Sequence, residues 1–162
     1  MIDSIDTQIL NIIQKDARIP NVEIARQVGL APSAVLERVR KLEERGVIRG
    51  YVTEIDSAQV GFGLTAFVFV RTSCCGTIDN VLAAIPEVSE VYDVAGEDCY
   101  LLKVRTKDTE ELGKLLREKL KTIPEIISTR TTVVLQTIKE TIALPIEEVN
   151  KTEKTNRGGK NK

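Results

Sequence analysis

Residues 30–46 constrain the fold of this chain more than any other stretch. Pro32 suits the first position of a helix, where its missing N–H costs nothing, and Gly46 suits the left-handed residue just past a helix end. Three apolar residues between them recur at i, i+4 and i+7 and form one helical face: Val35, Val39 and Leu42. The spacing predicts a helix that packs by this face and leaves the other one free.

The other face of this predicted helix begins with small residues and carries a net positive charge. The face, with Arg38 on its flank, consists of Ser33, Ala34, Glu37, Arg38, Arg40 and Lys41. Such a surface suits the major groove of duplex DNA, where Arg40 and Lys41 would reach phosphates or base edges. Two plainer interpretations stay open: a merely solvated helix face, and a structural ion pair of Arg38 with the second helix or its partner.

Two shorter helices are predicted before this one. Ser4–Lys15 has isoleucines at helical spacing, with Asp3, Ser4 and Asp6 supplying caps or first-turn charge. Asn21–Val28 has Asn21 as its N-cap and Gly29 at its end. Two helices joined by a short glycine-containing turn are typical of a helix-turn-helix, for which the first helix supplies the third wall of the core.

The second half of the chain alternates strand and helix patterns in the order βαββαβ. Predicted strands cover Leu64–Arg71, Val88–Ala95, Cys99–Thr106 and Ile126–Lys139, and predicted helices cover Thr77–Ile85 and Asp108 or Thr109 to Thr122. Ile-Pro-Glu occurs at residues 85–87 and again at 123–125, each time between a helix and a strand. Two such halves predict a ferredoxin-like sheet with both helices on one face.

The predicted fold class is α/β (α+β), with four parts. These are a helix-turn-helix domain at 1–50, a strand (Tyr51–Ile55) and linker at 51–63, a ferredoxin-like domain at 64–145, and a disordered basic tail at 146–162. The face of the sheet without helices needs cover, so we expect a homodimer that pairs face to face.

Composition excludes several classes of function. The chain has no histidine, so Ser-His and Cys-His catalysis are excluded, and we predict neither catalytic residues, nor a metal, nor a cofactor. The cysteines are few and two are adjacent, Cys74 and Cys75, a spacing that suits small apolar residues better than a structural disulfide or zinc ligands. No apolar run reaches membrane-spanning length and no signal peptide opens the chain, so we expect a cytoplasmic protein without a membrane partner.

Residues 3–51 resemble the N-terminal domain of the Lrp/AsnC regulators, the feast/famine regulatory proteins. The matching pieces include Asp3–Leu10, Glu23–Ala25, Val28–Leu30, Arg38–Glu43 and Gly46–Tyr51. The second half resembles that family's regulatory domain at Ile85–Val88, Gly96–Leu102 and Thr129–Leu135. The resemblance implies a sequence-specific DNA-binding transcription regulator that dimerises through its sheet domain and often forms tetramers or octamers.

The resemblance also implies a site for a small effector, often an amino acid, where sheet domains of neighbouring dimers meet. The positions that would line it are Gly96, Glu97, Asp98, Cys99, Thr131 and Thr132. Cys99 stands where the family usually has an aspartate that suits an effector's ammonium, and Asp98 lies one place earlier. The family's usual serine before the helix-starting proline is Ala31 here.

Two alternatives to the effector-controlled regulator remain. One is a DNA binder controlled by a partner or by no effector at all. The other is an enzyme, because some sirohaem decarboxylases share this overall shape. The resemblance implies that those enzymes use histidine and arginine around the tetrapyrrole, which a chain without histidine fits poorly.

Overall fold

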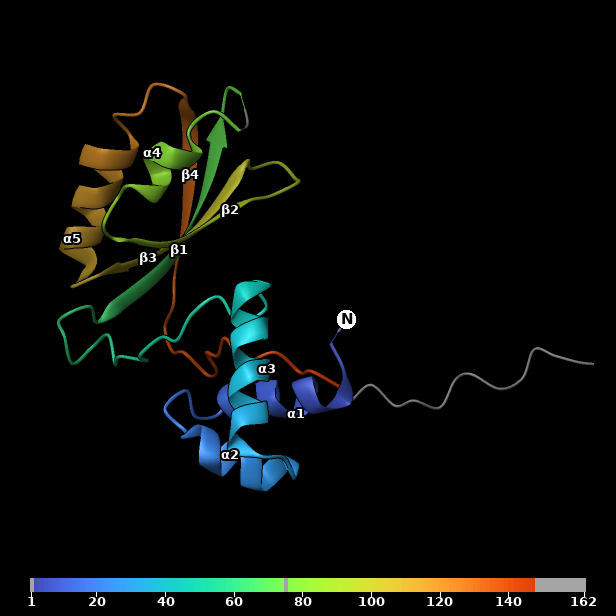
Figure 1. The fold of residues 1–162 in the computed structure, drawn as a ribbon. Helices are drawn as coiled ribbons and strands as arrows, with labels where there is room; N and C mark the ends of the chain where they lie inside the picture. The colour runs from blue at the N-terminus through green and yellow to red at the C-terminus, as the bar shows by residue number, and fades with distance from the viewer. Residues whose placement is uncertain (1, 75, 148–162) are drawn as a thin grey trace, which may run out of the picture. The chain divides into compact units, whose positions relative to one another are not determined.

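The computed structural model describes residues 2–74 and 76–147 of the 162-residue chain. The chain forms two compact units, Ile55–Glu140 and a unit that joins Met1–Glu54 with Thr141–Lys162 (Figure 1). We call Thr141–Glu147 the return segment. The return segment, which was expected in the sheet domain up to residue 145, belongs with the helices. In the described part of the chain, no helix is long and apolar enough to cross a membrane.

The helical unit contains α1 (Ser4–Ile13), α2 (Asn21–Val28) and α3 (Pro32–Glu44). Its core is an apolar cluster to which all three helices contribute: Ile9, Leu10, Ile24, Ala25, Val35, Val39 and Leu42. The predicted inner face of α3 is therefore confirmed. Gly29 and Gly46, at φ 70° and 69°, take the left-handed conformation that ends α2 and follows α3.

The three helices begin with different caps. At α1, Asp6 N–H donates to Asp3 Oδ1 (2.8 Å) and Asp3 N–H donates to Asp6 Oδ2 (3.2 Å), a reciprocal capping box. The N-cap of α2 is Pro20, not Asn21 as predicted, because Asn21 is already the first helical residue. Ala31 caps α3 without a side-chain hydrogen bond, so the helix start depends on the fixed φ of Pro32.

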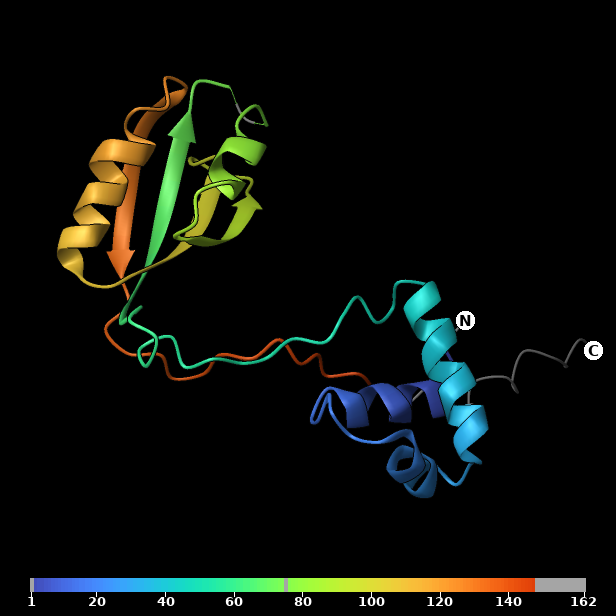
Figure 2. The same cartoon turned by 60° about the vertical axis from the view of Figure 1, so that its left-hand side comes forward.

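The sheet unit is a four-stranded antiparallel sheet with the spatial order β2-β3-β1-β4. Along the chain its elements are β1 (Leu64–Thr72), α4 (Asp79–Ala83), β2 (Val88–Asp93), β3 (Tyr100–Thr106), α5 (Thr109–Lys114), the π-helical η1 (Leu115–Leu120) and β4 (Ile126–Val133). The helices cover one face of the sheet (Figure 2). This is the predicted βαββαβ order and the ferredoxin-like arrangement.

Residue alternation along β1 separates the two faces of the sheet. Ala66, Val68 and Val70 are buried in the core beneath the helices, with Leu82, Leu112 and Leu120 above them. Phe67 and Phe69 point to the opposite face and are only half buried. We call the face that carries Phe67 and Phe69 the open face.

Several predicted elements differ from the structure. Tyr51–Ile55 is extended but forms no strand, because none of the described strands pairs with its backbone. β4 ends at Val133 rather than Lys139, since its neighbour β1 starts at Leu64 and the last rung joins Val134 N–H to Thr65 O at 2.9 Å. α4 covers only Asp79–Ala83 of the predicted Thr77–Ile85.

Candidate functional site

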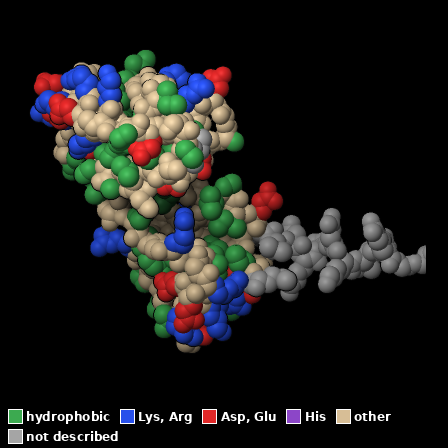
Figure 3. Space-filling view, turned by 90° about the horizontal axis from the view of Figure 1, so that it is seen from above, with side chains coloured by type: hydrophobic (Ala, Val, Ile, Leu, Met, Phe, Trp, Pro, Cys, Tyr) green, Lys and Arg blue, Asp and Glu red, His purple; other side chains and the backbone are tan. Residues whose placement is uncertain are grey.

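The outer face of α3 carries five of the six predicted DNA-binding residues in exposed positions: Ser33, Ala34, Glu37, Arg40 and Lys41. All five belong to the helix whose other side, Val35, Val39 and Leu42, fills the core. The core therefore holds the helix fixed while this face stays accessible. On the face seen in Figure 3, cationic and anionic side chains lie next to one another at several places.

The charges on this outer face are paired with one another. Arg40 donates two hydrogen bonds to Glu37, from Nε (3.1 Å) and from a terminal nitrogen (2.9 Å), and its other terminal nitrogen donates to Glu44 at 2.5 Å. Lys41 Nζ lies 3.3 Å from a Glu37 oxygen. The hydrogen bond from Arg40, followed by that from Lys41, lowers the pKa of Glu37 to about 2, so Glu37 is an anion at neutral pH.

Arg38, the sixth candidate, is bound inside the helical unit. One of its terminal nitrogens lies 2.8 Å from Asp3 and 2.6 Å from Asp6, the two residues of the α1 capping box. The guanidinium is one-third exposed, whereas the Asp6 side chain is 9 % exposed. This geometry favours the structural interpretation of Arg38. The ion pair is made with the start of α1 and not with α2 as expected, because packing and not the spacing of α3 decides which helix lies beside Arg38.

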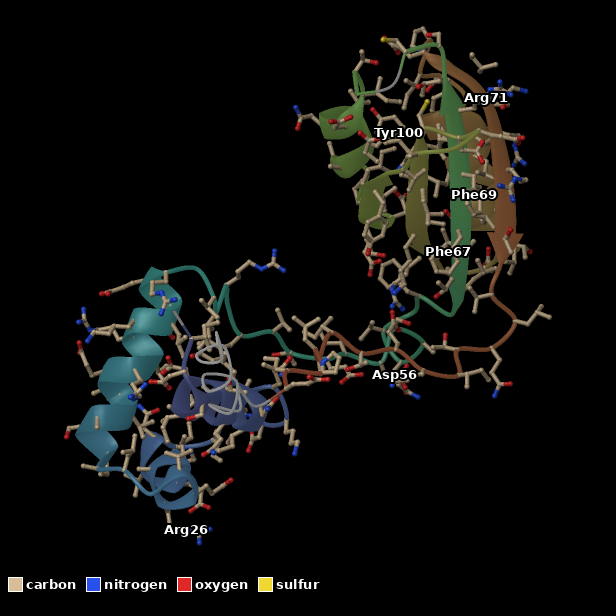
Figure 4. The ribbon with its side chains drawn as sticks, turned by 90° about the vertical axis from the view of Figure 1, so that its right-hand side faces the viewer. Arg26, Asp56, Phe67, Phe69, Arg71 and Tyr100 are labelled. Carbon is tan, nitrogen blue, oxygen red and sulfur yellow. The ribbon has the colours of Figure 1, made fainter. Side chains whose placement is uncertain are left out.

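In the sheet unit, the turn before β3 meets β4 through one ion pair. Asp98 accepts a hydrogen bond from Arg130 at 3.0 Å, and the Arg130 guanidinium lies 4.0 Å from the centre of the Phe69 ring. Phe69 and Arg130 are register partners on β1 and β4 (Figure 4 labels Phe67, Phe69 and Arg71 along β1). Asp98 is a residue predicted from the sequence, whereas Arg130 and Phe69 are not, and the alternation of Phe67 and Phe69 along β1 is the signal in the sequence that indicates the open face.

The other predicted effector residues lie in different positions around this pair. Gly96 and Glu97 are exposed in the turn, and a Cβ on Gly96 would meet open space. Thr132 pairs with Phe67 and shares the open face, whereas Thr131 pairs with the buried Val68 and therefore faces the helices. Only Thr132 of the two threonines is on the same face as Arg130.

Cys99 does not have the environment expected from the sequence. Its side chain is buried and its sulfur is disulfide-bonded, contrary to the expectation of small apolar thiols. Of the adjacent pair Cys74 and Cys75, the latter lies outside the described residues. Cys99 therefore offers an effector neither a carboxylate nor a thiol. In the described ranges, no cluster of three or more His, Cys, Asp or Glu could hold a metal ion.

Sequence comparison identifies both units. A profile of a winged helix-turn-helix DNA-binding domain matches residues 2–49, and a profile of the Lrp/AsnC ligand binding domain matches residues 65–144. The regulator FL11 of Pyrococcus horikoshii is 39 % identical over 148 residues, which are 90 % of this chain and 97 % of FL11. The chain belongs to the Lrp/AsnC family. AldR of Mycolicibacterium smegmatis is 41 % identical over 85 % of this chain and 84 % of its own.

Solved structures of Lrp/AsnC regulators have the same fold. Escherichia coli AsnC is 32 % identical, with a TM-score of 0.80 over 88 % of this chain and 98 % of AsnC. A Neisseria meningitidis transcriptional regulator in complex with L-methionine is 29 % identical, with a TM-score of 0.85 over 90 % of this chain and 97 % of its own. This Lrp/AsnC chain is thus a helix-turn-helix transcription regulator with a ligand-binding domain.

Proposed function

We propose that the chain reads its operator with the outer face of α3. The observation that carries the proposal is the division of this helix: a buried apolar face within the helical unit and an opposite, exposed face that carries Ser33, Ala34, Glu37, Arg40 and Lys41. Small residues at the start of the helix allow close approach to base edges, and the two cations follow about two turns later. Arg38 is left to a structural role.

The test is a fluorescence anisotropy titration with duplex DNA from the chain's own upstream region. Changing Arg40 and Lys41 together to Ala should weaken binding and make it less dependent on salt, with a slope about two units smaller on a log–log plot. Arg26→Ala is the matched control, because Arg26 is an exposed cation on α2 that pairs with Glu23 of the same helix. If the doubly changed chain and the control bind this DNA with equal affinity, the proposal that α3 contacts DNA is wrong.

We further propose that the ligand-binding domain takes an α-amino acid at the Asp98–Arg130 pair. The pair presents one anion and one cation 3.0 Å apart, which is complementary to the ammonium and carboxylate of an amino acid. Phe69 beneath Arg130 offers an apolar contact for a side chain. The methionine complex of the Neisseria neighbour supports this ligand class.

A thermal-shift screen of the twenty amino acids tests this second proposal. A ligand at 100 times its Kd should add about 2.7 kcal/mol to stability, and Asp98→Asn should abolish the shift. Glu97→Gln, on the neighbouring exposed residue, is the control and should keep it. If no amino acid shifts the melting temperature, the result favours a DNA binder that is controlled by a partner protein or has no effector. The disulfide-bonded Cys99, which offers no carboxylate, favours the same alternative. We propose regulation rather than catalysis in either case, because the matched relatives are transcriptional regulators.

A further inference from the structure

The hydrogen bonds of Arg40 involve all three nitrogens of its guanidinium group. Each of its three nitrogens donates to a carboxylate, two to Glu37 and one to Glu44. Lys41, the other cation of the outer face, also lies against Glu37. Glu37 therefore pairs with both of the cations, Arg40 and Lys41, that we propose to bind DNA.

This shared carboxylate changes what DNA meets when α3 approaches. The outer face from Glu37 to Glu44 holds two of these cations and two anions that pair with them, so its local charge is balanced. These ion pairs are about half exposed and individually weak, so they can open. When they open toward phosphates, however, Glu37 is left as an unpaired anion beside the phosphate backbone, which costs part of what the cations gain.

Among the base edges in the major groove, that of cytosine can donate a hydrogen bond to a carboxylate. Cytosine presents its N4 amino group as a hydrogen-bond donor there, and Glu or Asp is its usual protein partner. When the Glu37 carboxylate accepts a hydrogen bond from this amino group, its ion pairs with Arg40 and Lys41 can open. Both cations then become available to phosphates or to a guanine edge.

We propose that Glu37 is a specificity-determining residue that couples base identity to phosphate binding. On an operator with cytosine at the facing position, Glu37 accepts from the cytosine amino group and releases to the DNA Lys41 and the two Arg40 nitrogens that it holds, while Glu44 keeps the third. On other sequences its carboxylate keeps the two cations paired and repels the backbone. This inference rests on the proposed function, because it requires α3 to be the reading helix.

The test compares the full-length chain with its Glu37→Gln and Glu110→Gln variants. Glu110 lies on α5 in the other unit and pairs with Lys114 at 3.2 Å, so its change removes an equal charge from a unit that does not contain α3. Anisotropy titrations use a random-sequence duplex and a duplex from the upstream region, each over a series of salt concentrations. A selection from a random duplex library reads base preference directly.

Glu37→Gln should bind the random-sequence duplex more tightly, by about 5-fold, with a steeper salt dependence. In the selection, the preference for cytosine at one position of each half-site should fall by about 5- to 100-fold, and adenine should gain there, because glutamine pairs with the adenine edge. Glu110→Gln should behave like the unchanged chain in both measurements.

Two outcomes separate this inference from the proposed function. If Glu37→Gln matches Glu110→Gln in affinity and base preference while the Arg40 and Lys41 changes weaken binding, α3 reads DNA and only the role given to Glu37 is wrong. If the Arg40 and Lys41 changes have no effect either, the interface itself is wrong. Melting curves confirm that each variant is folded, which the exposed position of Glu37 leads us to expect.

Discussion

At the scale of the residue, Arg38 joins two helices that are far apart in the sequence. It binds both carboxylates of the α1 capping box, and one of them, Asp6, is almost completely buried. A buried carboxylate without its cation is costly, because water no longer solvates it. Arg38 therefore fixes α3 against the start of α1, and so fixes the direction of the proposed DNA-binding face.

Arg38→Ala should destabilise the helical unit by about 1–3 kcal/mol, the cost of leaving a buried charged group without its partner. Urea unfolding followed by circular dichroism measures the change. Arg26→Ala removes an exposed pair with Glu23 and should leave stability nearly unchanged, because water screens such a pair. Equal effects of the two changes would contradict the role given to Arg38.

Acid should weaken the same contact. The backbone N–H of Asp6, followed by the Arg38 guanidinium, lowers the pKa of Asp3 below its ordinary value of 3.8. A depressed pKa in the folded state means that the stabilisation is complete above about pH 4 and is lost as the pH falls through the folded-state pKa. The stability difference between the unchanged chain and Arg38→Ala should therefore shrink from pH 6 to pH 3 in urea titrations. A constant difference would show that Asp3 does not titrate with this contact.

At the scale of the element, the return segment is held to α1 by side-chain amides. Leu144 N–H donates to Gln14 Oε1 (2.6 Å), Gln14 Nε2 donates to Leu144 O (3.2 Å), and Asn11 Nδ2 donates to Ile146 O (3.0 Å). Ile146 also packs against the core of the helical unit. The segment that follows β4 in the chain is thus part of the DNA-binding unit.

Gln14→Ala should free the Leu144 amide, because its side-chain acceptor is removed. Amide hydrogen exchange should become faster at Leu144. The Val134 amide, which donates to Thr65 in the sheet unit, is the internal control and should exchange unchanged. Gln27→Ala, whose amide bonds only to Glu23 on α2, should leave both rates unaltered. Unchanged exchange at Leu144 in Gln14→Ala would mean that the segment is held without Gln14.

The hydroxyl of the buried Tyr100 bonds to the loop between β1 and α4 and to the first residue of α4. Tyr100 is fully buried, accepts a hydrogen bond from Gly76 N–H (2.9 Å) and donates one to Asp79 (2.5 Å). Burial, with the Asp79 hydrogen bond, raises the pKa of Tyr100 above its usual value of 10.0. Figure 4 shows this side chain on the side of the sheet that faces α4.

Tyr100→Phe should destabilise the sheet unit by about 1–3 kcal/mol, because the change leaves the partly buried Gly76 N–H without its acceptor. Thermal unfolding measures the loss. Tyr92→Phe removes a hydroxyl that is bonded to Glu90 at an exposed position and should be nearly neutral. If Tyr100→Phe is as neutral as this control, the loop is held by other contacts.

At the scale of the whole molecule, the open face of the sheet is the surface where we expect a second copy of the chain to bind. Phe67, Phe69 and Leu101 lie there half buried, beside Lys103, Arg105 and Arg130. Glu140 pairs with Lys103 and Arg105 and covers only part of β3. An apolar patch that is rimmed by charges suits a homodimer interface.

Phe67→Asp should turn a dimer into a monomer, because it places a charge at the centre of the patch that two copies would bury. Sedimentation velocity at several protein concentrations measures the mass. Val81→Asp puts the same charge on the exposed surface of α4, outside the open face, and should leave the dimer intact. Dissociation by both changes, or by neither, would contradict dimerisation through this face.

The sequence alone settled those features that depend on local periodicity. The cores of α3 and β1, the βαββαβ order and the ends of α2 and α3 follow from side-chain spacing, proline and glycine, which act within a few residues. The family followed from motifs spread along most of the chain. The length of β4 and the absence of a strand at Tyr51–Ile55 did not follow, because a strand exists only where a partner backbone pairs with it.

Tertiary structure decided which charged residues are free to act. Arg38, Arg40 and Lys41 look alike in the sequence, yet Arg38 is bound to α1 and the other two to Glu37. It also put Arg130 beside Asp98, 32 residues away, and the return segment against α1. Contacts of this kind depend on how separate elements pack, and a pattern read along one chain carries no information about the side chain that a fold brings opposite.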